Sequence, residues 1–285
     1  MGNKFKLFLH MIKIEHSLFA LPFAYIGCFL ANSNWPGLKV FLLISIAMVG
    51  MRSFAMAMNR IIDLKFDKIN PRTQDRPLVT GDITLKESWL FSIIFALIFV
   101  VACYGLNKLC FYLSFIALLW GGLYSFSKRF TSLCHFWLGS VLAMAPIGGW
   151  LGVDPHFQPV PVTFAFGVLF WVAGFDILYS IQDVDFDREQ GLFSLPSKLG
   201  VKSALWISCF SHIISIIFFF LGGWVAGLGT LYFIGWLIVS CILIFEHLIV
   251  NENSLDKINV AFFQMNAYVS CILLLAVLVD IFWVY

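Results

Sequence analysis

The chain has 285 residues, of which 61% are hydrophobic and 12% are charged, whereas an ordinary soluble domain is about 45–50% apolar and about 25% charged. This composition is typical of a protein that spans a membrane, and it excludes a sizeable soluble domain beside the membrane part. The formal charge of +2 is too close to balance, and the charges are too dispersed, to indicate a nucleic-acid partner. The seven cysteines include no CxxC pair, so neither a disulfide framework nor a zinc site is expected.

The N-terminal stretch up to His16 mixes lysines and Glu15 into an apolar segment, and no small-residue cleavage pattern follows it. We therefore expect it to be retained rather than removed as a signal peptide. Apolar runs then predict about nine transmembrane helices. They are expected near residues 15–32, 39–61, 88–105, 109–126, 132–152, 161–182, 202–222, 226–247 and 261–283. No linker or low-complexity tract interrupts them, so residues 1–285 are predicted to form a single transmembrane domain.

The basic residues predict an orientation, because short cytoplasmic loops collect Lys and Arg. With the N-terminus inside, all but three of the 18 Lys and Arg residues lie on the inner side. The exceptions are Lys39 and Lys108 on the outer side, and Arg52 inside a helix. We therefore expect a multi-pass membrane protein whose N-terminus and long loops, near residues 62–87 and 183–201, are cytoplasmic.

Acidic residues crowd around these two long inner loops. Asn59, Asp63 and Asp67 are spaced four residues apart, which places all three on one helix face. The same spacing recurs as Tyr179, Asp183 and Asp187, with Asp176 before them. The alternative is that these carboxylates are ordinary solvated loop charges, but two copies at equal spacing argue against it. Carboxylates at a membrane boundary are costly and mark function.

Paired carboxylates of this kind suit Mg²⁺, which binds through one or two carboxylates together with substrate phosphates. The natural ligand would therefore be a diphosphate bridged by the metal. Protein cations are also needed, and the same inner face carries candidates whose forked or extended side chains match phosphate oxygens. These candidates are Arg72, Arg76 and Lys128, with Tyr124 as a hydroxyl donor one turn before Lys128.

In this arrangement the chain resembles the UbiA superfamily of intramembrane prenyltransferases. The family pattern is an NxxxDxxxD segment on the second helix and a DxxxD segment on the sixth, which stand here as residues 59–67 and 183–187. The resemblance extends to NPRTQDRPL at 70–78, YSFSKRFT at 124–131 and DREQGLFSLPSKLG at 187–200. One DxxxD alone is a weak signal, but all of these segments in order along the chain are a strong one.

The resemblance implies an all-α bundle around a central cavity, capped by the two cytoplasmic loops, which transfers a polyprenyl group from its diphosphate to an acceptor. It implies Mg²⁺ as cofactor and the lipid bilayer, a polyprenyl diphosphate and an aromatic acceptor as partners; no sequence feature defines an oligomeric state. The expected metal ligands are Asn59, Asp63, Asp67, Asp183 and Asp187. The expected diphosphate-binding residues are Arg72, Arg76, Lys128 and Tyr124. Catalysis is assigned to the four aspartates with Tyr124 and Lys128, and acceptor binding to Arg52, Asp176 and Tyr179.

The segments at 13–25 and 171–196 look most like bacterial 4-hydroxybenzoate polyprenyltransferases of quinone biosynthesis, including the subgroup of the futalosine route to menaquinone. The acceptor would then be 4-hydroxybenzoate or, alternatively, a dihydroxynaphthoate. Both are hydroxyaryl carboxylates.

Two other classes stay open at this point. A secondary transporter would also have about nine helices with intramembrane charges, but it predicts charges near the midplane rather than beside long loops. A membrane CDP-alcohol phosphotransferase also uses aspartates with Mg²⁺, but its DGxxAR opening is absent here. The six histidines are scattered without ligand spacing, and none is expected to act in catalysis.

Overall fold

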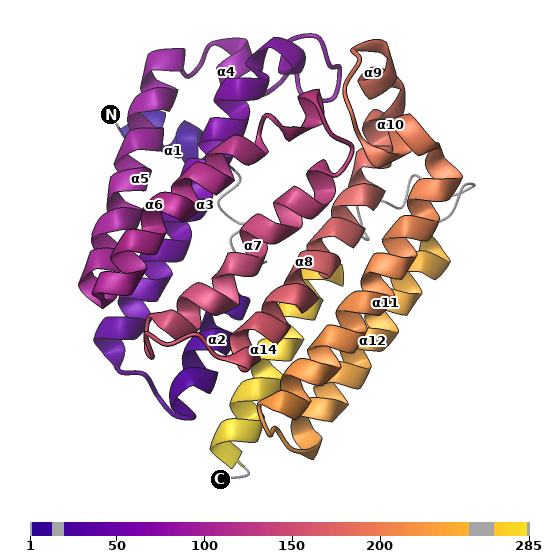
Figure 1. The fold of residues 1–285 in the computed structure, drawn as a ribbon. Helices are drawn as coiled ribbons and strands as arrows, with labels where there is room; N and C mark the ends of the chain where they lie inside the picture. The colour runs from indigo at the N-terminus through magenta and orange to yellow at the C-terminus, as the bar shows by residue number, and fades with distance from the viewer. Residues whose placement is uncertain (1, 13–19, 251–264, 284–285) are drawn as a thin grey trace. The chain divides into compact units, whose positions relative to one another are not determined.

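The computed structural model describes residues 2–12, 20–250 and 265–283, and every regular element within them is a helix (Figure 1). Eight of these helical segments are long and apolar enough to cross a membrane. They are residues Leu38–Asp67, Leu85–Leu106, Lys108–Arg129, Cys134–Leu151, Pro159–Glu189, Val201–Val225, Thr230–Ile249 and Asn266–Trp283. The shorter apolar helix α2, Leu21–Asn32, lies within the first predicted crossing. The prediction of an all-helical membrane protein with about nine helices is confirmed.

The described residues group into two compact units, one within Met1–Ser17 and Leu42–Phe126 and the other within Leu18–Phe41 and Ser127–Tyr285. We call them the first and the second unit. Each carries one of the two acidic segments. The expectation of a single domain over residues 1–285 stays a prediction.

The first unit contains α1 (Gly2–Met11), most of α3 (Leu38–Asp67), α4 (Pro77–Thr80), α5 (Leu85–Leu106) and α6 (Lys108–Tyr124). Helix α3 has 30 residues, about 45 Å at 1.5 Å per residue, whereas the hydrocarbon layer is about 30 Å thick. The helix is therefore longer than the apolar layer is thick, and the first acidic segment lies in its C-terminal turns. Below them, Phe8 of α1, Ala57 of α3 and Phe95 of α5 belong to one buried apolar cluster.

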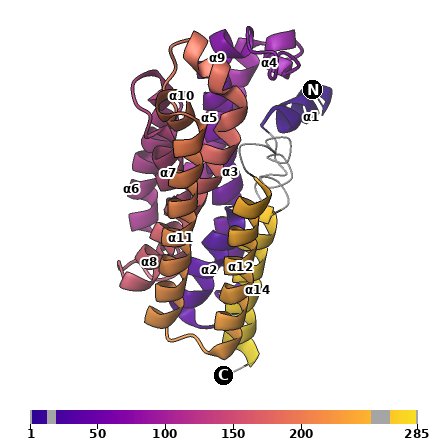
Figure 2. The same ribbon diagram turned by 90° about the vertical axis from the view of Figure 1, so that its right-hand side faces the viewer.

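The second unit contains α2, the short helix η2 (Ser127–Arg129), α7 (Cys134–Leu151), α8 (Pro159–Ser180), η3 (Ile181–Asp183), α9 (Val184–Glu189), α10 (Leu195–Leu199), α11 (Val201–Val225), α12 (Thr230–Ile249) and α14 (Asn266–Trp283). Helix α8 lies between α7 and α11, and α12 lies beside α11 and α14 (Figures 1 and 2). As a result α8 is the most buried of the long helices.

Small residues allow these helices to approach closely, as is common in membrane proteins. A methyl group on Gly149 of α7 would collide with the backbone of Ala24 in α2, and one on Gly139 would collide with the backbone of Leu169 in α8. Side-chain hydroxyls add interhelical hydrogen bonds, since Ser208 of α11 donates to the carbonyl of Gly174 over 2.7 Å. The central position of α8 is therefore fixed on both sides, and the acidic segment follows directly from its C-terminus.

Candidate active site

The first acidic segment forms the last turns of α3. Because α3 stays helical to Asp67, Asn59, Asp63 and Asp67 lie on one face, as the four-residue spacing predicts. The amide of Asn59 donates to Asp63 Oδ2 over 2.8 Å and accepts from Arg60 Nη1 over 3.1 Å. The side-chain oxygen of Asn59 therefore faces the Arg60 guanidinium, and its side-chain nitrogen faces the Asp63 carboxylate.

The loop after α3 folds back onto the end of that helix. The Asn70 side chain accepts from the backbone N–H of Arg72 over 2.9 Å, and the Thr73 hydroxyl donates to the carbonyl of Asp67 over 2.9 Å. These short-range bonds turn the chain so that Arg76 Nη1 lies 2.5 Å from Asp67 Oδ2. Both arginines expected to bind diphosphate belong to this loop. Arg72 is exposed at its surface, and Arg76 is paired with the Asp67 carboxylate.

The second acidic segment differs locally from the prediction. The expected continuous face through Tyr179, Asp183 and Asp187 is wrong, because α8 ends at Ser180 and a 3₁₀ turn, η3, leads into the separate helix α9. A 3₁₀ turn has three residues per turn instead of 3.6 and rotates the following side chains. Asp183 and Asp187 are nevertheless both buried, at 7% and 2% exposure.

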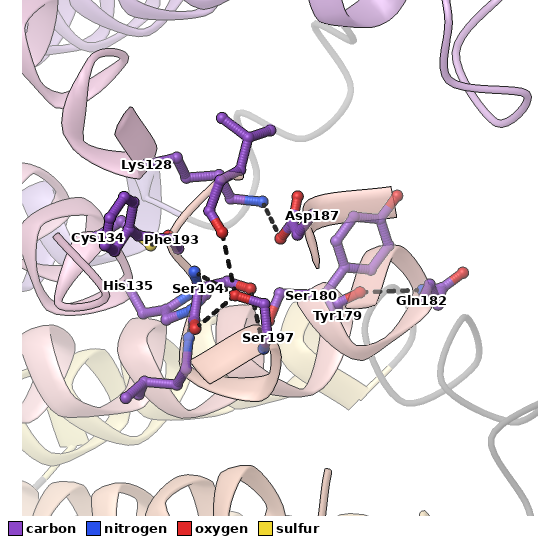
Figure 3. Close-up of polar contacts among 12 residues, drawn as sticks. Lys128, Cys134, His135, Tyr179, Ser180, Gln182, Asp187, Phe193, Ser194 and Ser197 are labelled. Atoms are coloured by element: carbon purple, nitrogen blue, oxygen red, sulfur yellow. Dashed lines mark hydrogen bonds and ion pairs between the residues drawn. The ribbon is translucent and has the colours of Figure 1, made fainter. Parts of the chain in front are cut away.

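Asp187 is paired with Lys128, whose Nζ lies 3.4 Å from Asp187 Oδ2 (Figure 3). The loop after α9 holds this pair in place. Its Leu192 N–H donates to the carbonyl of Asp187 over 2.8 Å, and its Phe193 N–H donates to the carbonyl of Lys128 over 2.7 Å. One loop therefore anchors the backbone of both partners.

The sequence interpretation missed a contact in the same unit. His135, near the start of α7, lies with Nδ1 2.7 Å from Asp176 Oδ2 of α8. Its other nitrogen, Nε2, accepts from the backbone N–H of Leu195 at the start of α10 over 3.3 Å. No sequence spacing could reveal this contact, because the histidine and the aspartate are 41 residues apart.

The second unit also contains a cluster of polar side chains formed by the buried His212 and Glu246 and the half-buried His247. His247 Nε2 and His212 Nδ1 are 2.9 Å apart, and the same His212 nitrogen is 3.6 Å from Glu246. Nearby, the Trp171 indole donates to Asn266 over 2.7 Å. These contacts join α8, α11, α12 and α14, and we read them as interhelical polar contacts inside the membrane part.

The three remaining candidate residues are all half-buried. Arg52 is half-buried on α3, two turns before Asn59, and Tyr124 is the half-buried last residue of α6. Tyr179 is half-buried in the last turn of α8, one turn after Asp176. Their roles stay predictions.

The donor chemistry of both units fits Mg²⁺. The aspartate pairs Asp63 and Asp67, and Asp183 and Asp187, offer only oxygen atoms, which this hard cation prefers. Within the described residues, no three His, Cys, Asp or Glu side chains gather in a group that could hold a metal by themselves. This is compatible with Mg²⁺, which keeps several waters and takes further oxygens from substrate phosphates.

The sequence profile described as the UbiA prenyltransferase family matches residues 20–269. This chain therefore belongs to the UbiA prenyltransferase family, and it is a prenyltransferase rather than a transporter or a CDP-alcohol phosphotransferase. It is a multi-pass membrane enzyme.

Curated relatives point the same way. The chain is 26% identical over 238 residues to the 4-hydroxybenzoate octaprenyltransferase of Shewanella woodyi, covering 82% of both chains. It is 27% identical over 241 residues to the protein of the same name from Tolumonas auensis, covering 83% of this chain and 82% of the relative.

Solved structures share the fold. The apo structure of a UbiA homologue from Aeropyrum pernix K1 superposes with a TM-score of 0.85 at 34% identity, covering 94% of this chain and 98% of that one. A UbiA homologue from Archaeoglobus fulgidus, bound to GPP and Mg²⁺, superposes with a TM-score of 0.66 at 21% identity over 94% of this chain and 99% of that one.

Proposed function

We propose that this enzyme transfers a polyprenyl group from a polyprenyl diphosphate to the ring of an aromatic hydroxy-carboxylate, 4-hydroxybenzoate in the first instance, in an Mg²⁺-dependent reaction of quinone biosynthesis. One observation carries the proposal. In each unit the last aspartate of the acidic segment is paired with a basic side chain. Asp67 is paired with Arg76 in the first unit, and Asp187 is paired with Lys128 in the second. Such pairs keep an anion-binding cation and a metal-binding carboxylate side by side, which a metal–diphosphate ligand requires.

Asn59, Asp63 and Asp67 would hold Mg²⁺ in the first unit, and Asp183 and Asp187 would hold Mg²⁺ in the second. Bound Mg²⁺ would screen the charge of the diphosphate and so make it a better leaving group. Arg76 keeps further N–H donors beyond the one that contacts Asp67, because a guanidinium has five. Arg76 can therefore bind phosphate oxygens while it stays in contact with Asp67. Arg72 and Lys128 are further cations for the phosphate oxygens, and Tyr124 is a hydroxyl donor.

The allylic carbon that loses the diphosphate develops positive charge. Preorganised carboxylates and hydroxyls stabilise that charge, while an apolar surrounding excludes the water that would otherwise capture it. The buried positions of Asp183 and Asp187 support this role. The acceptor carboxylate needs a cation, for which Arg52 on α3 is the candidate.

The relatives named 4-hydroxybenzoate octaprenyltransferase support the hydroxybenzoate acceptor. The alternative acceptor is a dihydroxynaphthoate, which also carries a ring hydroxyl and a carboxylate. The excess of basic residues in the loops with the acidic segments supports a cytoplasmic position for those loops and for the N-terminus, in a bacterial inner membrane.

The test is an assay of the purified enzyme in detergent or nanodiscs with prenyl diphosphates of increasing length, each combined with 4-hydroxybenzoate, a dihydroxynaphthoate and a phenol without a carboxylate. Products are identified by mass spectrometry. We expect a prenylated hydroxyaryl carboxylate, formed only with Mg²⁺. Formation of no prenylated aromatic product with any pair would overturn the proposal, and preference for the naphthoate would select the alternative acceptor.

A further inference from the structure

The C-terminal half of α8 has an unusual pattern of exposure. From Trp171 to Ile181 every residue is buried except Asp176 and Tyr179, which are one helical turn apart and therefore on the same face. The side chain of Asp176 is 21% exposed. A carboxylate directed into hydrocarbon would be costly, so the exposed part of Asp176 is expected to meet polar groups or water rather than lipid tails.

His135 fixes the orientation of the Asp176 carboxylate. In the described part of the chain, His135 is the only side chain that hydrogen-bonds to it. Because His135 Nε2 accepts from the backbone N–H of Leu195, the ring proton must be on Nδ1, and Nδ1–H donates to Asp176 Oδ2. His135 itself is completely buried. The aspartate thus presents its second oxygen, Oδ1, from a rigid support.

The position of Asp176 suits the acceptor rather than the diphosphate. It precedes Asp183 by seven residues along α8 and η3, about 10 Å of helix. If Lys128 binds the diphosphate, and Asp183 and Asp187 hold the metal that would accompany it, this length accommodates the allylic carbon and one aromatic ring beyond it. Asp176 would then lie beside the ring that is alkylated.

From this geometry we propose that Asp176 is the catalytic base that removes the ring proton of the acceptor and that His135 is the positioning residue that holds its carboxylate. The inference rests on the proposed aromatic prenyl transfer. The bond from allylic carbon to oxygen breaks with its electron pair going to diphosphate, and a ring π pair forms the new carbon–carbon bond. The proton on that ring carbon passes to Asp176, and its C–H pair restores the aromatic ring.

Two variants of His135 separate its two hydrogen bonds. In His135→Asn, the amide nitrogen can replace Nδ1 and donate to Asp176, while the acceptor for Leu195 is lost. In His135→Gln, the amide oxygen can replace Nε2 and accept from Leu195, while the contact with Asp176 is lost. Asp176→Asn keeps an acceptor for His135 but removes the basic carboxylate, so the packing is preserved.

The experiment measures kcat, the KM of both substrates and the ratio of kcat for ordinary acceptor to kcat for acceptor deuterated at the ring carbons beside the hydroxyl. We expect Asp176→Asn to lower kcat about 10²-fold, as loss of a general base does, and to raise the isotope ratio above the wild-type value. His135→Gln should lower kcat about 10-fold or more, because small misplacements of a reacting group are costly, with the same rise in the ratio. His135→Asn, which keeps the hydrogen bond to Asp176, should retain most of the wild-type kcat.

The chain provides a matched control in a second His–Asp contact of the described residues, in which the exposed His156 lies 2.6 Å from the half-buried Asp154. The variants His156→Asn and Asp154→Asn should leave kcat and the isotope ratio unchanged. Thermal unfolding of every variant separates loss of structure from loss of chemistry.

The inference is overturned if the isotope ratio stays at the wild-type value in Asp176→Asn and His135→Gln, or if His135→Asn and His135→Gln lose rate equally. In both cases the wild-type enzyme still makes a prenylated aromatic product, so the proposed function stands. If the wild-type enzyme prenylates no aromatic acceptor, the proposed function fails and the inference fails with it.

Discussion

Arg76 lies with its Nη1 2.5 Å from Asp67 Oδ2, across the turn that follows α3. A residue expected to bind diphosphate is thus already bound to one expected to bind the metal. The contact orients both groups and satisfies the charge of each in the absence of substrate. Lys128 and Asp187 have the same relationship in the second unit.

For Arg76 we predict a selective effect on the prenyl diphosphate. Arg76→Ala removes charge-assisted hydrogen bonds worth about 1.5–3 kcal/mol, so the KM for the prenyl diphosphate should rise about 10- to 10²-fold while the acceptor KM changes little. Arg76→Lys should restore only part of this, since lysine lacks the forked geometry. Steady-state kinetics with each substrate varied in turn measures both KM values. A rise confined to the acceptor KM would show that Arg76 binds the acceptor rather than the diphosphate.

Two of the proposed metal-binding aspartates, Asp63 and Asp183, should control kcat. Asp63→Asn and Asp183→Asn should each lower kcat about 10²-fold or more, as removal of a key electrostatic group does, while thermal unfolding stays close to wild type. The matched control is Asp185→Asn, because Asp185 lies between Asp183 and Asp187 but is 88% exposed and, among the described residues, has only a long surface contact with Arg188. Near-normal turnover of both Asp63→Asn and Asp183→Asn would show that the acidic segments have another role.

Removal of divalent ions should abolish turnover, because the aspartates of each acidic segment would otherwise repel a diphosphate. Activity is measured before and after EDTA treatment and after addition of Mg²⁺. Calorimetric binding of an uncleavable prenyl diphosphate analogue, with and without Mg²⁺, gives a second measurement that does not depend on turnover. Full activity in EDTA would contradict metal-assisted binding.

Arg52 is predicted to bind the acceptor carboxylate. A guanidinium placed inside a crossing needs an anion, and a bidentate contact to a carboxylate would satisfy it. Arg52→Ala should therefore raise the KM for 4-hydroxybenzoate about tenfold or more and leave the KM of a phenol without a carboxylate unchanged. Equal effects on both acceptors, or a large loss of thermal stability, would indicate a structural role instead.

Two adjacent glycines of α7 should differ sharply in their tolerance of a methyl group. Gly149→Ala would collide with the backbone of Ala24 in α2, whereas the space beside Gly148 is open. We expect Gly149→Ala to lose about 1–3 kcal/mol of stability through overpacking, while Gly148→Ala gains up to about 1 kcal/mol in helix propensity. Thermal unfolding in nanodiscs compares them, and equal melting temperatures would contradict the close approach of α2 and α7.

Local patterns in the sequence predicted the features that depend on neighbours along the chain. Hydropathy predicted the long helices because an apolar segment in lipid must satisfy its own backbone hydrogen bonds. The spacing of Asn59, Asp63 and Asp67 predicted their common face because α3 stays helical through all three. The same reasoning failed for Asp183 and Asp187, where a 3₁₀ turn interrupts the helix.

The sequence alone therefore determined the membrane class, the approximate helices and the residue types of the candidate site, since these follow from composition and from short periodic spacing. Only the tertiary structure decided which side chains meet. The pairing of Lys128 with Asp187 joins residues 59 apart, and that of His135 with Asp176 joins residues 41 apart. Such contacts depend on how α7, α8 and the loop after α9 pack together. That packing is set by close approaches such as that of Gly139 to Leu169, which no local pattern encodes.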